Sequence, residues 1–277
     1  MIPVALCADD YALSPGVGEG ILALAAQKRI SAFSCMTASV RWPEAAAALR
    51  PLFDTIDIGL HFTLTRLAPL GPMPRLAPNG AFPPMGRLYA RATLRAIDAD
   101  EIAQELERQL SAFKAATGRE PDFLDGHHHV HQLPVVRDVV ARIWGKRSGW
   151  IRNTATPLAS IFSRGVAQPR VIVIASYGRA ARSVWTSAGI KTNTDFAGVR
   201  DFTERGSYGV LMRAYLKGAQ PGLLIMCHPG RPDDELGKID HVVASREDEL
   251  AYLSSAEFPA DLAAAGCRVA RLSAAAR

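Results

Sequence analysis

The sequence predicts an α/β fold, in which parallel strands and helices alternate within one barrel-like domain covering residues 1–277. Short apolar runs alternate along the chain with segments of helical periodicity, which is the pattern of repeated strand–helix units and a parallel sheet. The 277 residues are enough to bury one full core. We find no repeat, low-complexity linker or change of composition that would divide them.

Local signals place most of the elements. Ser14 followed by Pro15 is typical of a helix N-cap with proline at the first helical position. Residues 98–101 resemble a capping box, and Gly118 suits the end of the helix that follows. We expect strands at 4–8, 32–40, 56–62, 123–127, 150–153, 191–196, 222–227 and 268–272. We expect helices after Ser14, after Pro134, and at 43–50, 100–117, 170–189, 207–218 and 246–255.

Residues 66–96 break this rhythm. Six prolines and three glycines within 66–87 predict an irregular segment. Long irregular segments inside a compact domain are usually functional or disordered. Because this segment leaves the end of the strand at 56–62, we expect an insertion that lies near the active site and shapes specificity.

Composition narrows the classes of partner and compartment. The net charge of +5 is mild, and no basic run with interleaved aromatics points to nucleic acid. No segment reaches the roughly 20 apolar residues of a membrane span, and the start of the chain lacks the features of a signal peptide. The four cysteines show no CxxC spacing, which favours buried free thiols and a reducing compartment: Cys7, Cys35, Cys227 and Cys267. We expect a cytoplasmic protein. The sequence does not decide its oligomeric state, and a homodimer is one possibility.

Metal- and proton-handling side chains stand at the ends of several predicted strands. Asp9 and Asp10 follow the first strand, and His61, His127 and His228 end or follow three others. Taken singly, the aspartates could form a solvated turn and His61 could be a core residue. Parallel barrels carry their active sites at the carboxyl ends of the strands, so we expect these side chains to converge. Such a set is typical of a divalent metal site in a hydrolase.

Four histidines crowd residues 127–131. Alternation along an extended strand would place Asp125, His127, His129 and His131 on one face, with His128 on the other. The position between an apolar strand and a proline-started helix argues against a tag-like surface tract. One or two of these imidazoles can ligate one ion, and the others are expected to hydrogen-bond around it or contact substrate. We predict substrate contacts for His129 and His131.

Two further strand-end residues are candidates. His228 is a candidate proton donor, because its unperturbed pKa lies near neutrality; a turn histidine is the alternative. Arg152 is predicted to orient a carboxylate or to bind the hydroxyls of substrate, and a surface salt bridge is the equal alternative. The glycines at 16–20 do not have the spacing of a dinucleotide-binding motif.

Four motifs, taken in order, are similar to those of the YdjC-like (ChbG/HpnK) carbohydrate deacetylases. They are ADDYALSPGV from residue 8, GLHFTLT from 59, DGHHHVH from 125 and CHPG from 227. The resemblance implies a distorted (β/α) barrel related to the polysaccharide deacetylases. It also implies a divalent cation held by Asp10, His61 and His127, with Asp9 as the catalytic base. The implied substrate is an N-acetylated sugar, chito-oligosaccharide-like or lipid-linked.

The resulting hypothesis is metal-assisted amide hydrolysis. Asp9 takes a proton from the attacking water, and His228 protonates the leaving amine, so that acetate is released. One carboxylate and two imidazoles suit Zn²⁺, Mn²⁺ or Fe²⁺ better than Mg²⁺, whereas the resemblance implies Mg²⁺. The identity of the ion therefore stays open.

Two other functions remain as alternatives. One is a different single-metal hydrolase, such as a phosphoesterase, although two-metal phosphoesterases need more bridging carboxylates than we find. The other is a non-catalytic glycan- or lipid-binding protein with a relic site. A relic predicts the loss of a base or a ligand, yet all five candidates are present: Asp9, Asp10, His61, His127 and His228.

Overall fold

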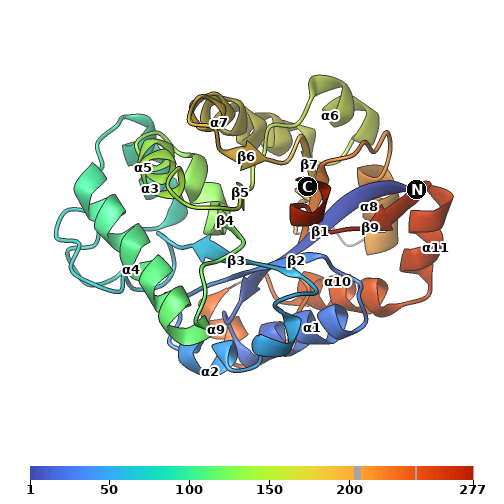
Figure 1. The fold of residues 1–277 in the computed structure, drawn as a ribbon, viewed down its shortest axis with the longest axis horizontal. Helices are drawn as coiled ribbons and strands as arrows, with labels where there is room; N and C mark the ends of the chain where they lie inside the picture. The colour runs from blue at the N-terminus through green and yellow to red at the C-terminus, as the bar shows by residue number, and fades with distance from the viewer. Residues whose placement is uncertain (203–206, 241, 277) are drawn as a thin grey trace.

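The computed structural model describes residues 1–202, 207–240 and 242–276, and helices surround its curved central sheet (Figure 1). The strands are β1 (Ile2–Tyr11), β2 (Ala32–Cys35), β3 (Asp57–Phe62), β4 (Phe123–Gly126), β5 (Trp150–Ile151), β6 (Lys191–Thr192), β7 (Asp195–Ala197), β8 (Leu223–Cys227) and β9 (Cys267–Val269). The α-helices are α1 (Pro15–Ala26), α2 (Trp42–Ala46), α3 (Met85–Thr93), α4 (Ala99–Thr117), α5 (Val136–Trp144), α6 (Leu158–Arg164), α7 (Gln168–Ser187), α8 (Tyr208–Tyr215), α9 (Leu236–Ile239), α10 (Ala244–Ser254) and α11 (Glu257–Ala264). The 3₁₀ segments are η1 (Arg50–Leu52), η2 (His127–Gln132) and η3 (Ser273–Ala276).

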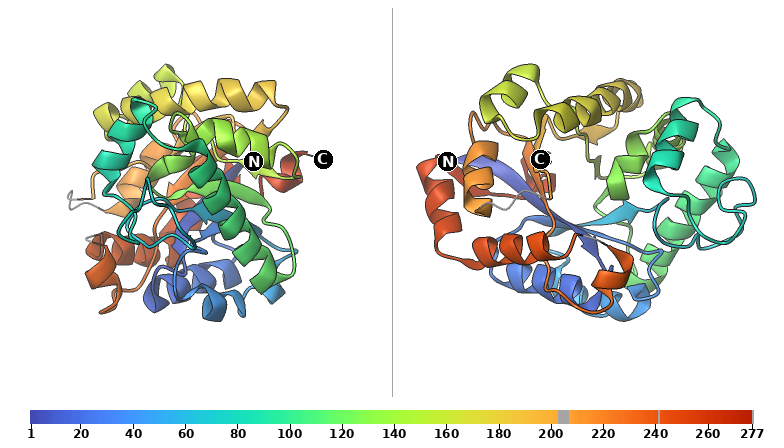
Figure 2. Two further views of the ribbon diagram at one scale, coloured as in Figure 1. Left: turned by 90° about the vertical axis from the view of Figure 1, so that its left-hand side faces the viewer. Right: turned by 180° about the vertical axis from the view of Figure 1, so that it is seen from behind.

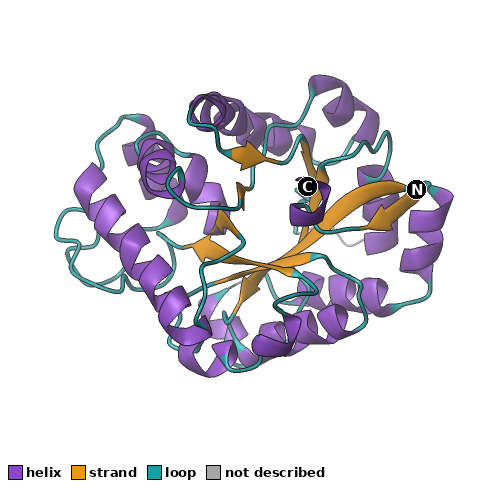
Figure 3. Ribbon diagram, viewed as in Figure 1, coloured by secondary structure: helices purple, strands orange, loops and turns teal. Residues whose placement is uncertain are grey.

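The strands form one parallel sheet in the order β6-β5-β4-β3-β2-β1-β8-β7, with β9 beside β1. Parallel neighbours need crossover connections, and the helices that supply them lie around the outside of the strands (Figure 3). All strands therefore end at the same side of the molecule. The predicted α/β barrel-like fold is confirmed, and the carboxyl ends of the strands meet as expected.

A side chain extends the pairing of β5 with β6 at one edge of the sheet. The predicted strand at 191–196 is split: β6 pairs with β5, and β7 pairs with β8 on the other flank. Between them, the Asn193 carboxamide accepts a hydrogen bond from the Asn153 amide and donates one to the Asn153 carbonyl, each at 2.7 Å. The one predicted strand is therefore two short strands that pair with different neighbours, and Asn193 lies between them.

Helix ends follow the expected chemistry. The hydroxyl of Ser14 accepts from the amide of Val17 at the start of α1, with Pro15 at the first position. Asp98 caps α4 through the amides of Asp100 and Glu101, and Gly118 ends the helix in the left-handed region at φ 74°. One long helix was predicted at 170–189, and the structure has one there, α7, with slightly earlier bounds (Gln168–Ser187).

Several boundaries were wrong. The expected strand at 32–40 stops at Cys35, because residues 36–39 form a turn in which the amide of Ser39 donates to the carbonyl of Met36. Residues 66–96 are not irregular throughout, since 85–93 form α3. Helices α6 and α11 were not expected at all.

Buried carboxylates of α4 hold the proline-rich part of this segment. The carboxylate of Glu101 accepts from the amides of Arg75 at 2.7 Å and Leu76 at 2.9 Å. Glu105 accepts from the amide of Leu70 at 3.0 Å. The proline-rich segment forms no regular backbone pairing, so its buried amides need other hydrogen-bond acceptors. The carboxylates of α4 supply them, and α4 therefore determines the path of the segment. The left view of Figure 2 shows this part of the chain beside α4.

All four cysteines are free and buried, as predicted. Among residues 1–202, 207–240 and 242–276, no helix has both the length and the apolar character needed to cross a bilayer.

Candidate metal centre and active site

A bulge in β1 directs two adjacent carboxylates into one site. Between Ala8 and Tyr11 the pairing of β1 with β2 slips, and Asp10 adopts φ 70°. On a regular strand, neighbouring side chains point to opposite faces. Here the backbone turns, so that Asp9 and Asp10 both reach the carboxyl end of the barrel, and both are almost fully buried.

Asp10, His61 and His127 converge from β1, β3 and the first residue of η2. Oδ1 of Asp10 lies 3.1 Å from Nε2 of His61 and 3.0 Å from Nδ1 of His127. One ligand atom of each lies within 4.8 Å of the others. The structure thus brings together the three residues predicted as metal ligands, although they are separated by up to 117 positions.

The chemistry of this group suits a divalent cation. With metal–ligand bonds of about 2.1 Å, neighbouring donors on one ion stand roughly 3 Å apart, which is the spacing of these atoms. The donor set is one carboxylate oxygen and two imidazole nitrogens, all from buried residues. Divalent transition metals accept ligands of these types. We therefore treat the group as able to hold one divalent ion.

His61 is oriented from behind by a carboxylate. Its Nδ1 lies 2.6 Å from Oδ1 of Asp125 and 2.9 Å from Oγ of Ser34. Burial alone would lower the pKa of His61, but Asp125 and Asp10 outweigh it and raise the pKa to about 10. A carboxylate on the far nitrogen is the usual arrangement behind a metal-binding histidine, because it fixes the ring and the tautomer.

Asp10 is held in its ionised form. Burial would raise the pKa of its carboxyl, but Arg246 and His127 hold that pKa well below its usual range. Oδ2 of Asp10 lies 2.6 Å from Nη2 of Arg246, which leaves Oδ1 to face the two histidines.

Arg152 occupies a second group of possible ligand atoms. Cys7, Asp9 and Asp125 also bring donor atoms within 4.8 Å of one another. The guanidinium fills that space, 3.0 Å from the Cys7 sulfur, 2.5 and 2.6 Å from the oxygens of Asp9, and 2.6 Å from Asp125. A fixed positive charge thus stands where a second cation would bind, which counts against a two-metal mechanism.

Arg152 is enclosed by protein groups. Its side chain is fully buried, and it contacts Cys7, Asp9 and Asp125. These contacts fit the interpretation in which Arg152 orients a carboxylate, through an internal ion pair and not a surface salt bridge. Contact with substrate stays a prediction.

His228 stands beside Asp9. Its Nε2 lies 3.9 Å from Oδ2 of Asp9, and its side chain keeps 15% of its surface exposed. The backbone amide of His228 donates to Glu249 at 2.6 Å, which fixes the turn after β8. The ring of Phe202 packs edge-on against the imidazole at 5.4 Å. Substrate can therefore approach a histidine that neighbours the candidate base.

The histidine run does not continue the strand. Residues 127–132 form η2, and His128 and His129 have left-handed φ values of 55° and 57°. The prediction of alternating faces was wrong, because two successive left-handed residues rotate the side chains in different directions. The hydroxyl of Tyr89 donates to the carbonyl of His128 at 2.5 Å and supports this strained conformation.

The four histidines consequently have different surroundings. His127 faces Asp10, while Nδ1 of His128 lies 2.9 Å from the hydroxyl of Thr65. His129 is partly exposed, and its ring meets Phe196 edge-on. His131 is fully buried, with Nε2 2.9 Å from the carbonyl of Arg152 and its ring stacked on Trp185. His131 thus supports the scaffold, and a sugar cannot reach it in this structure.

Sequence reasoning missed several residues of this site. Asp125 lies just before the histidine run, at the end of a predicted strand. That position could have indicated a residue of the site. Ser34, Arg246, Asp240 and Glu249 lie in ordinary strand, loop and helix contexts that no local pattern distinguishes.

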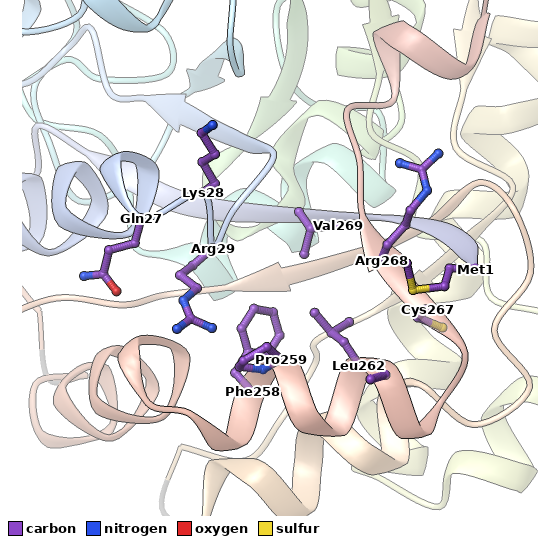
Figure 4. A pocket seen from close by; sticks show the side chains of 11 residues that line it. Met1, Gln27, Lys28, Arg29, Phe258, Pro259, Leu262, Cys267, Arg268 and Val269 are labelled. Carbon is purple, nitrogen blue, oxygen red and sulfur yellow. The ribbon is translucent and has the colours of Figure 1, made fainter.

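A separate hollow lies at the opposite end of β1. It has a volume of about 540 Å³ and is lined by apolar side chains of α11 and β9, and Lys28, Arg29 and Arg268 also line it (Figure 4). Its lining includes neither the three candidate ligands nor Asp9 and His228. The buried cluster at the carboxyl ends is the candidate site on chemical grounds.

Comparison with known proteins agrees with this geometry. The model of the family described as YdjC-like protein matches residues 3–264. The chain belongs to the YdjC-like family. Among curated relatives of this YdjC-like chain, the chitooligosaccharide deacetylase of Yersinia pestis (strain Pestoides F) is 33% identical over 264 residues, covering 95% of this chain and 94% of the relative. The protein of the same name from Yersinia pseudotuberculosis serotype O:1b (strain IP 31758) matches equally.

Solved structures share the fold of this YdjC-like chain. A candidate cellobiose-phosphate cleavage protein from Enterococcus faecalis V583 superposes with a TM-score of 0.73 at 20% identity, covering 99% of this chain and 98% of that one. A peptidoglycan N-acetylglucosamine deacetylase gives 0.51 at 13% identity, covering 98% and 86%. A family 4 acetyl xylan esterase from Clostridium thermocellum, solved with a cobalt ion, gives 0.50 at 13%, covering 98% and 88%. The barrel is therefore related in fold to polysaccharide deacetylases.

Proposed function

We propose that this chain is a metal-dependent hydrolase that removes the N-acetyl group from an acetylated amino sugar and releases acetate. The observation that carries the proposal is the convergence of Asp10, His61 and His127, with Asp9 and His228 beside them. The name of the Yersinia relatives supports an N-acetylated chito-oligosaccharide as the substrate class. A sugar linked to a lipid has the same reacting group and is part of the test below.

Asp10, His61 and His127 would hold one divalent cation. That cation would act as a Lewis acid toward the acetyl carbonyl and would favour ionisation of the attacking water. Zn²⁺, Mn²⁺ and Fe²⁺ suit the imidazole ligands, while Mg²⁺ is the ion that the family resemblance implies.

Asp9 is proposed as the base. Its carboxylate lies in the same bulge as Asp10 and is held by Arg152 on both oxygens. This contact fixes the direction of the carboxylate, so that little reorganisation is needed when it accepts the proton of water.

His228 is proposed as the proton donor to the leaving amine. It is partly exposed, close to Asp9 and anchored through its backbone to Glu249. His129, which is also partly exposed, remains the candidate for contact with the sugar. A cytoplasmic location and a homodimer remain predictions from the sequence.

An acetate-release assay tests the proposal. The purified, untagged chain would be stripped with a chelator and assayed on N-acetylglucosamine oligomers, acetylated glycolipids and phosphate esters, before and after addition of each metal. We expect acetate from at least one acetylated sugar only after a metal is returned. Hydrolysis of phosphate esters alone would favour the alternative hydrolase, and sugar binding without any hydrolysis would favour a relic site.

A further inference from the structure

Arg246 contacts a candidate metal ligand from far along the chain. The residue lies on α10, 236 positions after Asp10, and only 1% of its side chain is exposed. Its Nη2 lies 2.6 Å from Oδ2 of Asp10 and 3.0 Å from Oδ2 of Asp240. Its Nε donates to the carbonyl of Val242 at 2.9 Å. Three acceptors thus fix the plane of the guanidinium.

The two carboxylate oxygens of Asp10 consequently have different contacts. Oδ1 faces the rings of His61 and His127, whereas Oδ2 faces Arg246. Rotation of the carboxylate would break a short charge-assisted hydrogen bond inside the protein, and such bonds are about twice as strong as neutral ones. The backbone of Asp10 is in the left-handed region, which is unfavourable for aspartate and needs support from surrounding contacts.

We propose that Arg246 is a positioning residue of the metal centre, which holds Asp10 so that only Oδ1 is offered to the cation. The inference rests on the proposed function, because it assumes that the Asp10 group holds a metal. Asp240 acts as the second anchor that keeps Arg246 in place.

The same anchor reaches the segment beside the site. Oδ1 of Asp240 lies 3.5 Å from Nη2 of Arg66, and Nη1 of Arg66 donates to the carbonyl of Ile239 at 2.9 Å. Arg66 is the first residue of the 66–96 segment. Three successive ion pairs therefore link Asp10 to the start of this segment: Asp10–Arg246, Arg246–Asp240 and Asp240–Arg66.

The test is metal affinity, measured without substrate. Arg246→Lys keeps the positive charge but loses the planar guanidinium, whose Nη2 contacts both carboxylates while its Nε donates to the carbonyl of Val242. Titration calorimetry of Mn²⁺ into the stripped protein should show binding about 10–100-fold weaker than in the wild type, as is typical when a partner of a metal ligand is changed. The matched control is Arg164→Lys, since Arg164 is also buried and pairs with Asp195, which is not one of the candidate ligands. The control should bind Mn²⁺ as the wild type does.

Folding is followed by thermal unfolding of every variant. If Arg246→Lys does not fold, Asp240→Asn replaces it. This change keeps the Arg246–Asp10 pair and removes the charge of the second anchor, together with the ion pair to Arg66, which does not contact Asp10 directly. We then expect several-fold weaker binding. Wild-type affinity in a folded Arg246→Lys protein, or in Asp240→Asn where that variant replaces it, would overturn the inference. If the wild-type chain binds Mn²⁺ but releases no acetate, only the proposed function is contradicted. The role of Arg246 is still decided by the ratio of the Mn²⁺ affinities of the wild type and the variant.

Discussion

Arg152 binds both carboxylate oxygens of Asp9, with Nη1 2.6 Å from Oδ2 and Nη2 2.5 Å from Oδ1, although 143 positions separate the two residues. The same Nη2 lies 2.6 Å from Asp125, whose other oxygen holds His61. One buried arginine therefore orients the proposed base and, through Asp125, a proposed metal ligand.

Removing this arginine should be severe. Arg152→Met leaves Asp9 and Asp125 buried without their counter-charge, and breaking a buried ion pair from one side typically costs about 3–5 kcal/mol. We expect the free energy of unfolding to fall by that amount, as measured by urea denaturation with circular dichroism. A loss below about 1 kcal/mol, the size usual for exposed pairs, would show that the contact is not structural.

Asp9→Asn should separate metal binding from turnover. The change keeps the shape of the side chain but removes the proton acceptor, so we expect acetate release to fall by about 10²–10⁴-fold. Metal content, measured by elemental analysis, should stay near that of the wild type because Asp9 is outside the Asp10–His61–His127 group. The comparison variant Asp10→Asn should lose both bound metal and acetate release. Rates near the wild type in Asp9→Asn would remove Asp9 from the mechanism.

Glu105→Gln should loosen the proline-rich segment. The carboxylate of Glu105 accepts three hydrogen bonds from N–H groups. They come from the amide of Leu70, the carboxamide of Gln109 and Nε of Arg108. A glutamine turns an NH₂ toward one of them, and an unsatisfied buried group costs about 1–3 kcal/mol. We expect lower stability to urea and faster proteolysis within 66–84.

Glu107→Gln is the control for that change on the same helix. Its side chain is half exposed and pairs with Arg147 at the surface, so the change should alter stability by less than about 0.5 kcal/mol. Equal proteolysis of the two variants would contradict the proposed anchoring.

His131 should make the fold sensitive to acid. Burial, with the charge of Arg152, lowers the pKa of His131 to about 3, although the hydrogen bond to the Arg152 carbonyl acts in the opposite direction. In the unfolded chain the pKa is about 6.5. The unfolded state therefore binds more protons between these values. The contribution of neutral His131 is complete above pH 6.5 and is lost as the pH falls toward 3, by at most about 1.4 kcal/mol per pH unit.

His131→Gln can still donate to that carbonyl but does not titrate. We expect its free energy of unfolding to depend less steeply on pH between 6 and 4 than that of the wild type, in urea denaturation at a series of pH values. Parallel curves for the two proteins would show that His131 is not the group responsible.

Residues at strand ends could be predicted because the rule behind them is local. An apolar run locates a parallel strand, and the residue that follows must lie at the carboxyl end of the barrel, where Asp10, His61 and His127 are found. The same rule failed for residues 128–131. It assumes an extended backbone, whereas His128 and His129 adopt left-handed conformations supported by Tyr89 of α3, a helix the sequence did not predict.

Local patterns along the chain were enough to predict the α/β fold, the strand ends that carry the candidate ligands, and the motifs that identify the family. The residues that surround those ligands became known only from the folded arrangement. Arg152, predicted to orient a carboxylate or to bind substrate, is buried between Asp9 and Asp125, and Arg246, which no motif includes, holds Asp10. The physical reason is that a buried charge must find its counter-charge in space. That partner can lie on any element the fold brings near, so neither spacing nor periodicity along the chain reveals it.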